Sequence, residues 1–186
     1  MKLNNKGFTL IEILAVIVIL SVLSGIAVMG VMSTINNSKT KSYEIMIGNI
    51  ASAADALYKE VENSYLIGTA LDEYDSNGKS SNKIEIKDGV INTKLQTLVS
   101  NGFLTGVNNN CSDNDGDNSC TNKNGKVLLN PKDSSDLGNC IIVITKCGVT
   151  AISNDDYCPS INDFSKYFKG EIDYNAVNGV KVTCDS

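Results

Sequence analysis

Glu12 is the residue whose position says most about the chemistry of this chain. It is the only acidic residue in the apolar run from Phe8 to Met32. A carboxylate in such a run costs roughly 2.5–3.5 kcal/mol at the centre of a membrane helix, and less near an end. A cation or a set of hydrogen-bond donors must therefore compensate it. Glu12 is accordingly a candidate functional residue, and its expected chemistry is ion pairing.

The run around Glu12 is long enough to cross a bilayer as a helix, which takes roughly 18 or more apolar residues. Lys2 and Lys6 precede the run, and no basic residue lies within it. The positive-inside rule then places the leader in the cytoplasm and the remainder outside. A secretory signal would carry its apolar region before the cleavage site. A plain membrane anchor, which stays open as an alternative, would not need Glu12.

The residues from Gly7 to Glu12 read GFTLIE, and an apolar run follows them. This pattern closely resembles the amino terminus of type IV prepilins and of the related pseudopilins of secretion and DNA-uptake systems. The resemblance implies that a prepilin peptidase cleaves between Gly7 and Phe8 and that the new Phe8 amine is N-methylated. It also implies that Glu12 is the carboxylate needed for assembly. It covers only the amino-terminal part of the chain.

The family's usual account gives Glu12 a partner. The Phe8 amine of an incoming subunit lies opposite Glu12 of a neighbour, so that two charges in an apolar setting satisfy each other. A subunit in another axial register leaves both charges unpaired, so Glu12 would set the register. A protonated Glu12 without a partner stays open as the alternative. The implied partners are further copies of the chain, the prepilin peptidase, and an assembly ATPase with its membrane platform.

Composition excludes most enzyme chemistry. The 186-residue chain has a net charge of −5 and no His. Without His, Ser-His-Asp and Cys-His catalysis and HExxH zinc sites are ruled out, and no phosphate-binding GxxxxGK[ST] loop is present. The acidic balance argues against nucleic acid as a partner. We therefore expect a non-enzyme.

A second helical pattern follows the apolar run. Apolar residues recur at steps of three and four, which places them on one face of a helix: Tyr43, Met46, Ile47, Ile50, Ala54, Leu57, Val61 and Tyr65. The two patterns together predict one helix from about Thr9 to about Tyr65. At 1.5 Å per residue it would be about 85 Å long.

The rest of the chain predicts a small antiparallel sheet. Ile84 to Ile91 flank a turn at Asp88-Gly89 and predict a short hairpin, and Leu95 to Leu104 predicts a helix ending near Gly102. Further strands are expected at 126–129, 140–146 and 148–152. A last hairpin is expected to join 174–177 to 180–184 through Asn178-Gly179, a dipeptide suited to a tight turn.

Six cysteines lie in this part, which we expect outside the cell, and an even count there predicts disulfides: Cys111, Cys120, Cys140, Cys147, Cys158 and Cys184. The absence of His and of any CxxC pair argues against zinc. Six cysteines allow 15 connectivities. The odd spacing of Cys140 and Cys147 on one strand would point them to opposite faces, so they should pair elsewhere. Many pilins close a carboxyl-terminal disulfide loop, and by that resemblance we expect Cys140–Cys184, with Cys111–Cys120 and Cys147–Cys158.

The loop from Cys111 to Cys120 carries Asp113, Asp115 and Asp117 at alternate positions. This spacing resembles the start of a calcium loop, in which hard oxygen ligands converge on the ion. The sixth and twelfth positions, Asn118 and Asn124, depart from the EF-hand pattern. A calcium site therefore stays open beside the favoured interpretation, a solvated acidic turn closed by a disulfide. No other cofactor is expected.

Together these observations predict an α+β protein with a long amino-terminal helix, first transmembrane and then amphipathic, packed on a disulfide-stabilised head. The expected segments are the leader 1–7, the span 8–32, the amphipathic half 33–66 and the head 67–186. The resemblance implies a type IV pilus subunit that supports adhesion, surface motility or biofilm formation. It would sit in the cytoplasmic membrane before assembly and in an extracellular filament afterwards. The alternatives are a pseudopilin of a type II secretion or DNA-uptake system, and a membrane-anchored ligand-binding module.

Overall fold

The computed structural model describes residues 9–67, 70–75, 80–108, 126–152, 155–173 and 181–184, without the side chains of 25–30, 65–67, 81, 108 and 181. The chain divides into two compact units, Met1–Lys41 and Ser42–Ser186. Among the described residues, the apolar core and the strands all lie in the second unit. The segment boundaries expected from the sequence, including the one after residue 66, stay predictions.

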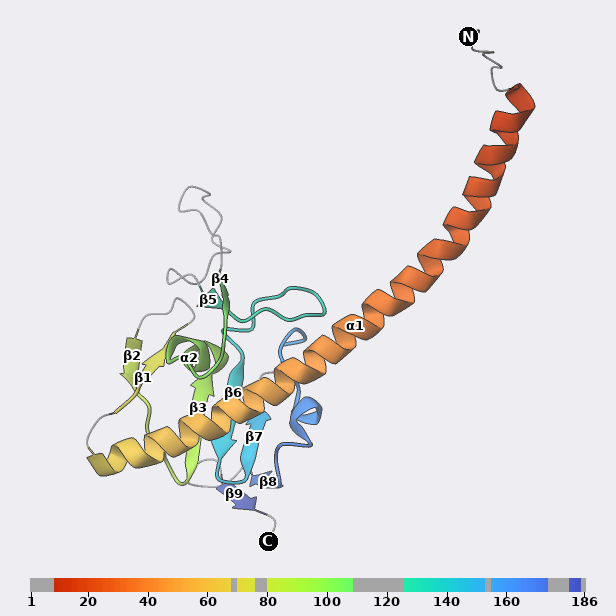
Figure 1. Cartoon of the computed structure of the whole chain (residues 1–186). Coiled ribbons are helices and arrows are strands. Elements are labelled where there is room, and N and C mark those ends of the chain that lie inside the picture. The colour runs from red at the N-terminus through yellow and green to blue at the C-terminus, as the bar shows by residue number, and fades with distance from the viewer. Residues whose placement is uncertain are drawn as a thin grey trace. The chain divides into compact units, whose positions relative to one another are not determined.

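Helix α1 runs without interruption from Leu10 to Ile67, which confirms the predicted long helix (Figure 1). No proline lies in this stretch, so no backbone donor is missing along it. Within the second unit its buried residues repeat the predicted stripe: Tyr43, Met46, Ile47, Ile50, Ala54, Leu57 and Val61. The helix therefore presents one apolar face to the head.

A three-stranded antiparallel sheet packs against this face of α1. It consists of β3 (Val90–Lys94), β6 (Ile141–Thr145) and β7 (Gly148–Ala151), in that order. Side chains from α1 and from this sheet form one apolar core, and helix α2 (Leu95–Ser100) continues directly from β3 into the same core. The predicted α+β architecture is thus confirmed.

Three two-stranded antiparallel ribbons complete the described head. They are formed by β1 (Asp72–Tyr74) with β2 (Ser80–Lys83), by β4 (Val107–Asn108) with β5 (Lys126–Val127), and by β8 (Gly170–Asp173) with β9 (Lys181–Cys184). A short 3-10 helix, η1 (Ile161–Phe164), precedes β8. Isolated two-stranded ribbons are marginal in water, so each depends on packing or on a covalent link to the main sheet.

The predicted hairpin at Asp88-Gly89 is only partly correct. Its turn forms, with both residues at positive φ (53° and 78°), as a type I′ turn requires. The predicted pairing of the two hairpin strands is limited to one bridge, between Lys87 and Val90. Strand β3 pairs along its whole length with β6 instead, because β6 is almost entirely buried and apolar.

The other strand predictions differ from the structure mainly in their ends. Strands β6 and β7 fall where they were expected, whereas β5 stops at Val127 rather than continuing to Leu129. At the carboxyl end, β9 lies in the second predicted strand, and its partner is β8 at Gly170–Asp173. The first predicted strand, at 174–177, and the Asn178-Gly179 turn lie outside the described residues.

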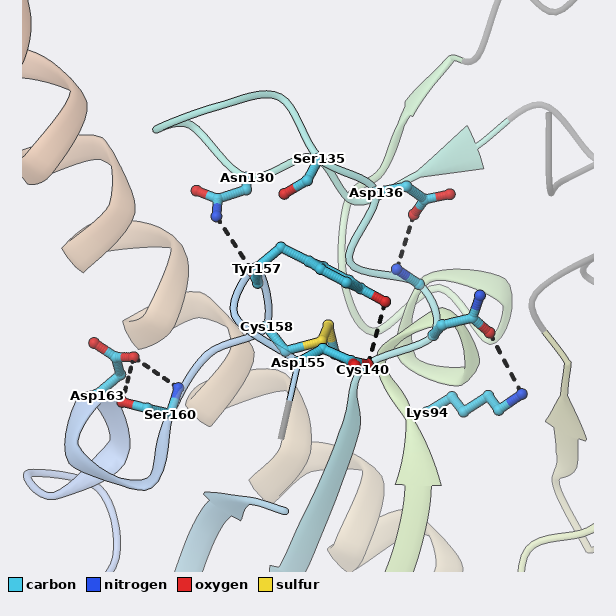
Figure 2. The surroundings of a disulfide bond; sticks show 12 residues. Lys94, Asn130, Ser135, Asp136, Cys140, Asp155, Tyr157, Cys158, Ser160 and Asp163 are labelled. Atoms are coloured by element: carbon cyan, nitrogen blue, oxygen red, sulfur yellow. Dashed lines mark hydrogen bonds between the residues drawn. A yellow bond between two sulfur atoms is a disulfide. The ribbon is translucent and has the colours of Figure 1, made fainter. Parts of the chain in front are cut away.

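Two disulfides lie among the described residues of the head, and they correct the expected pairing. Cys140 bonds to Cys158 (Figure 2), and Cys147 bonds to Cys184. The expected Cys140–Cys184 and Cys147–Cys158 pairs are therefore wrong. Cys140 and Cys147 do bond to different partners, as expected, but not because they share a strand: Cys140 precedes β6 and Cys147 lies in the turn after it. Spacing could not decide the partners, since the loop that carries Cys158 and the strand β9 that carries Cys184 are placed by long-range packing.

Asp163 links η1 to the start of the buried part of α1. Its Oδ2 accepts hydrogen bonds from the Ser160 backbone N–H (2.7 Å) and hydroxyl (2.8 Å) (Figure 2) and from the Tyr43 hydroxyl (3.0 Å). The Lys132 ammonium lies 3.5 Å from the centroid of the Tyr43 ring, a cation–π arrangement. Burial raises the pKa of Asp163, but the bonds from Ser160 and Tyr43 and the charge of Lys132 outweigh burial and lower it. Burial and the neighbouring Asp163 raise the pKa of Tyr43.

We expect Asp163→Ala to lower the free energy of unfolding by about 1–2 kcal/mol at neutral pH, since it removes a cap and a bond between elements. Because the folded pKa lies below the unfolded value of about 3.9, ionised Asp163 stabilises the fold above that value. This contribution is lost as the pH falls through the folded pKa, and the variant then approaches the parent in stability. Urea titrations at several pH values measure this. Asp156→Ala, which removes an exposed carboxylate, is the control; an equal loss in both variants would contradict the assignment.

Candidate assembly site at the amino-terminal end of the helix

Glu12 lies in the first turn of α1 and closes a capping box with Thr9. The Thr9 backbone N–H and hydroxyl both donate to Glu12 Oε2, at 2.8 Å each. The Glu12 backbone N–H lies 3.4 Å from Thr9 Oγ1. The first N–H groups of a helix have no partner within it, and a reciprocal cap of this kind satisfies two donors at once. The box therefore fixes where α1 begins and how the Glu12 carboxylate is held.

This cap was missed in the sequence interpretation, although its signal was present. Thr9 and Glu12 form the T-x-x-E pattern that marks a helix start before an apolar run. For Glu12 we had expected an amine on another chain or, as the alternative, a protonated carboxyl group without a partner. Both roles are compatible, because the two Thr9 bonds fall on Oε2 and a carboxylate can accept about four hydrogen bonds.

The large apolar side chains on both sides of Glu12 lie exposed in the single chain. Leu10 is 84% exposed and Ile11 73%, and the large apolar residues from Ile13 to Leu23 are exposed by half or more. Apolar surface of this extent marks a site of contact with other proteins or with lipid. Among the residues that the structure describes, no helix is both long and apolar enough to cross a membrane. The span predicted from Phe8 to Met32 is thus not confirmed.

Several predicted site residues lie outside the described residues. These are the cleavage junction Gly7 and Phe8, the acidic residues Asp113, Asp115 and Asp117, and the cysteines Cys111 and Cys120. The calcium site and the Cys111–Cys120 bond therefore stay predictions. Of the expected assembly residues, the structure places Glu12 alone.

Comparison with family models finds a match at the amino-terminal end of the chain. Residues 2–28 match the model described as the prokaryotic N-terminal methylation motif. This is the signal motif of type IV prepilins and pseudopilins. The match to the prepilin motif includes Gly7, Phe8 and Glu12, and it supports prepilin cleavage. It indicates a type IV pilin-like protein, either a pilin or a pseudopilin, and points to a structural subunit that assembles into a filament rather than to an enzyme.

The comparisons find similarity to known proteins at the amino-terminal end alone. Searches of curated proteins and of solved structures find no match to the chain. The prepilin motif covers the beginning of α1 and none of the head. The head therefore has to be interpreted from its own geometry.

Proposed function

We propose that this chain is a structural subunit of a type IV pilus, which polymerises through α1 after a prepilin peptidase cleaves between Gly7 and Phe8. The observation that carries the proposal is the match to the prepilin motif at the end of a long helix whose apolar side chains are exposed. Packing such helices side by side removes this apolar surface from water, at roughly 25 cal/mol per Å². In this proposal the head forms the filament surface and supports adhesion, surface motility or biofilm formation.

Before assembly the proposed location is the cytoplasmic membrane, with a single pass through residues 8–32, the leader inside and the head outside. Lys2 and Lys6 on one side of the apolar run support this orientation. Extraction into the filament exchanges lipid for neighbouring helices. An assembly ATPase and a membrane platform are the proposed drivers of this exchange.

Cleavage gives Glu12 its proposed partner. The new Phe8 amine is a cation next to Thr9, and it meets Glu12 of a neighbouring chain. Thr9 occupies Glu12 Oε2, so Oε1 is the proposed acceptor for the incoming amine. The free energy of an ion pair in apolar surroundings depends strongly on its geometry, and removing one partner leaves a buried charge that is unpaired. The pair therefore selects one axial register between adjacent helices.

The first test separates a pilus from a secretion or DNA-uptake machine. Cells lacking this chain should lose surface filaments that can be sheared off, and antibodies against the head should decorate those filaments in electron micrographs of the parent. Protein secretion and DNA uptake are measured in the same two strains. Unchanged filaments with a loss of secretion or uptake would overturn the pilus proposal in favour of a pseudopilin.

A further inference from the structure

The two disulfides of the described head cross each other along the sequence. Cys140 bonds to Cys158 and Cys147 bonds to Cys184, with sequence separations of 18 and 37. Cys147 therefore lies inside the loop that the first bond closes, and its partner lies outside that loop. Four cysteines can be paired in three ways, and this is the one in which the two bonds cross.

A bond that the folded head does not contain is favoured in the unfolded chain. Cys140 and Cys147 are seven positions apart, closer than either native pair. The probability of closing a flexible loop falls as about the 3/2 power of its length. In an unfolded chain, Cys140 and Cys147 should therefore meet roughly four times as often as Cys140 and Cys158, and roughly twelve times as often as Cys147 and Cys184. Oxidation before folding is expected to produce this wrong bond.

The wrong bond and the central strand of the main sheet exclude each other. Strand β6 lies between the two cysteines and is paired on both sides, with β3 and with β7. A strand rises about 3.3 Å per residue, so an extended β6 keeps Cys140 about 16 Å from Thr145. Thr145 pairs with Gly148, which places Cys147 in the turn beyond the strand. Because a disulfide needs Cα atoms within about 7 Å of each other, a chain with a Cys140–Cys147 bond cannot form β6.

The two native bonds differ in their accessibility. Cys140 is 1% exposed and Cys158 is 8% exposed, so the folded head closes their bond off from other proteins (Figure 2). Cys147 and Cys184 are each partly exposed. An error at Cys140 must therefore be corrected before the core forms, whereas the Cys147–Cys184 bond can form after the core.

We propose that a protein thiol–disulfide isomerase is a partner of this chain and exchanges the bond at Cys140 before the head folds. A thiolate of the enzyme attacks the Cys140 sulfur, and Cys147 leaves as a thiolate. The Cys158 thiolate then attacks the same sulfur, which forms the native bond and releases the enzyme thiolate. The number of disulfides does not change, so this exchange needs no oxidant.

The second native bond forms last. Cys147 and Cys184 pass two electrons and two protons to the disulfide of a thiol–disulfide oxidoreductase, which becomes a dithiol. The inference requires that the head reach an oxidising compartment outside the cytoplasm, as in the proposed function. It does not require that the chain polymerise.

The test refolds the full chain in a zwitterionic detergent. The chain is reduced and unfolded in urea, then diluted into a glutathione redox buffer with or without protein disulfide isomerase. Free thiols are alkylated at intervals and the bonds are mapped by mass spectrometry. Trypsin cleaves after Lys146 and a protease specific for Asp cleaves before Asp155, which places Cys140, Cys147 and Cys158 on separate peptides. We expect Cys140–Cys147 to be the most frequent early bond among the four cysteines. The enzyme should speed its conversion into the native pairs by about tenfold, because uncatalysed rearrangement takes minutes to hours.

Cys147→Ser combined with Cys184→Ser is the matched control, because this variant lacks the competing cysteine. Its Cys140–Cys158 bond should form without acceleration by the enzyme. Both chains keep Cys111 and Cys120, so exchange with those two cysteines is common to both. An equal acceleration in both chains would overturn the proposal.

Oxidation of the parent in concentrated urea is a second measurement, and it needs no folded variant. There the Cys140–Cys147 bond should exceed the Cys140–Cys158 bond by about fourfold, the ratio expected from loop length. Absence of the Cys140–Cys147 bond in urea, or native bonds that form first and at the same rate with and without the enzyme, would overturn the proposal. Neither result would bear on the pilus proposal, which is tested on surface filaments.

Discussion

Glu12→Ala is expected to abolish filaments while leaving the head folded. In the proposed filament, the variant leaves each incoming Phe8 amine buried beside an apolar neighbour. Breaking a buried ion pair by removing one partner costs about 3–5 kcal/mol. Since every 1.4 kcal/mol is tenfold, each subunit contact should weaken by about 100-fold or more. Electron microscopy and quantification of the sheared fraction measure the loss, and circular dichroism of the purified chain should show an unchanged head.

Thr9→Ala distinguishes this role from helix capping. If Glu12 serves only to close the capping box, the two variants should be equally defective, because each opens the same box. If Glu12 also pairs with an amine on another chain, Thr9→Ala should cost about 1 kcal/mol of helix stability. It should then still produce filaments. Equal defects in Thr9→Ala and Glu12→Ala would contradict the register role of Glu12.

Replacing Cys147 and Cys184 together by serine should produce the largest loss of stability in the head. This disulfide closes a loop with a sequence separation of 37, against 18 for Cys140–Cys158. In the chain-entropy model these loops correspond to about 4 and about 3 kcal/mol. For a chain of this size, a loss of about 4 kcal/mol lowers Tm by about 8–16 °C. Thermal unfolding of the two double-serine variants measures both effects.

The two double-serine variants should lose stability in different parts of the head. Cys147–Cys184 is the covalent link between the β6–β7 turn and the two-stranded β8–β9 ribbon. Without it, that ribbon should lose amide hydrogen-exchange protection before the main sheet does. Cys140 and Cys158 are both largely buried in the apolar core, at 1% and 8% exposed. Their loss should lower protection around β6. A peptide map with Cys140–Cys184 and Cys147–Cys158 would contradict both expectations.

The features that the sequence predicted correctly are those set by residues close together in the chain. The stripe from Tyr43 to Val61 fixed the length and the buried face of α1, because steps of three and four define one side of a helix. Asp88-Gly89 predicted its turn, because few residues adopt positive φ at low cost. For the site, the spacing of Gly7, Phe8 and Glu12 was sufficient to identify the prepilin motif.

The features that the sequence could not predict depend on competition between distant segments. Segment 84–87 and β6 both compete for β3, and the buried apolar β6 wins. The cysteine pairing has the same origin, because spacing along the chain does not show which distant segment comes to lie beside a given cysteine.

The most direct test of the account is the mass of the mature chain in the sheared filament fraction, by intact-mass and peptide mass spectrometry. The account predicts an abundant chain that begins at Phe8 with one additional methyl group on its amine, and whose residues 1–7 are missing. A chain that still begins at Met1, found in the membrane fraction and absent from sheared filaments, would contradict it and would leave a membrane-anchored module.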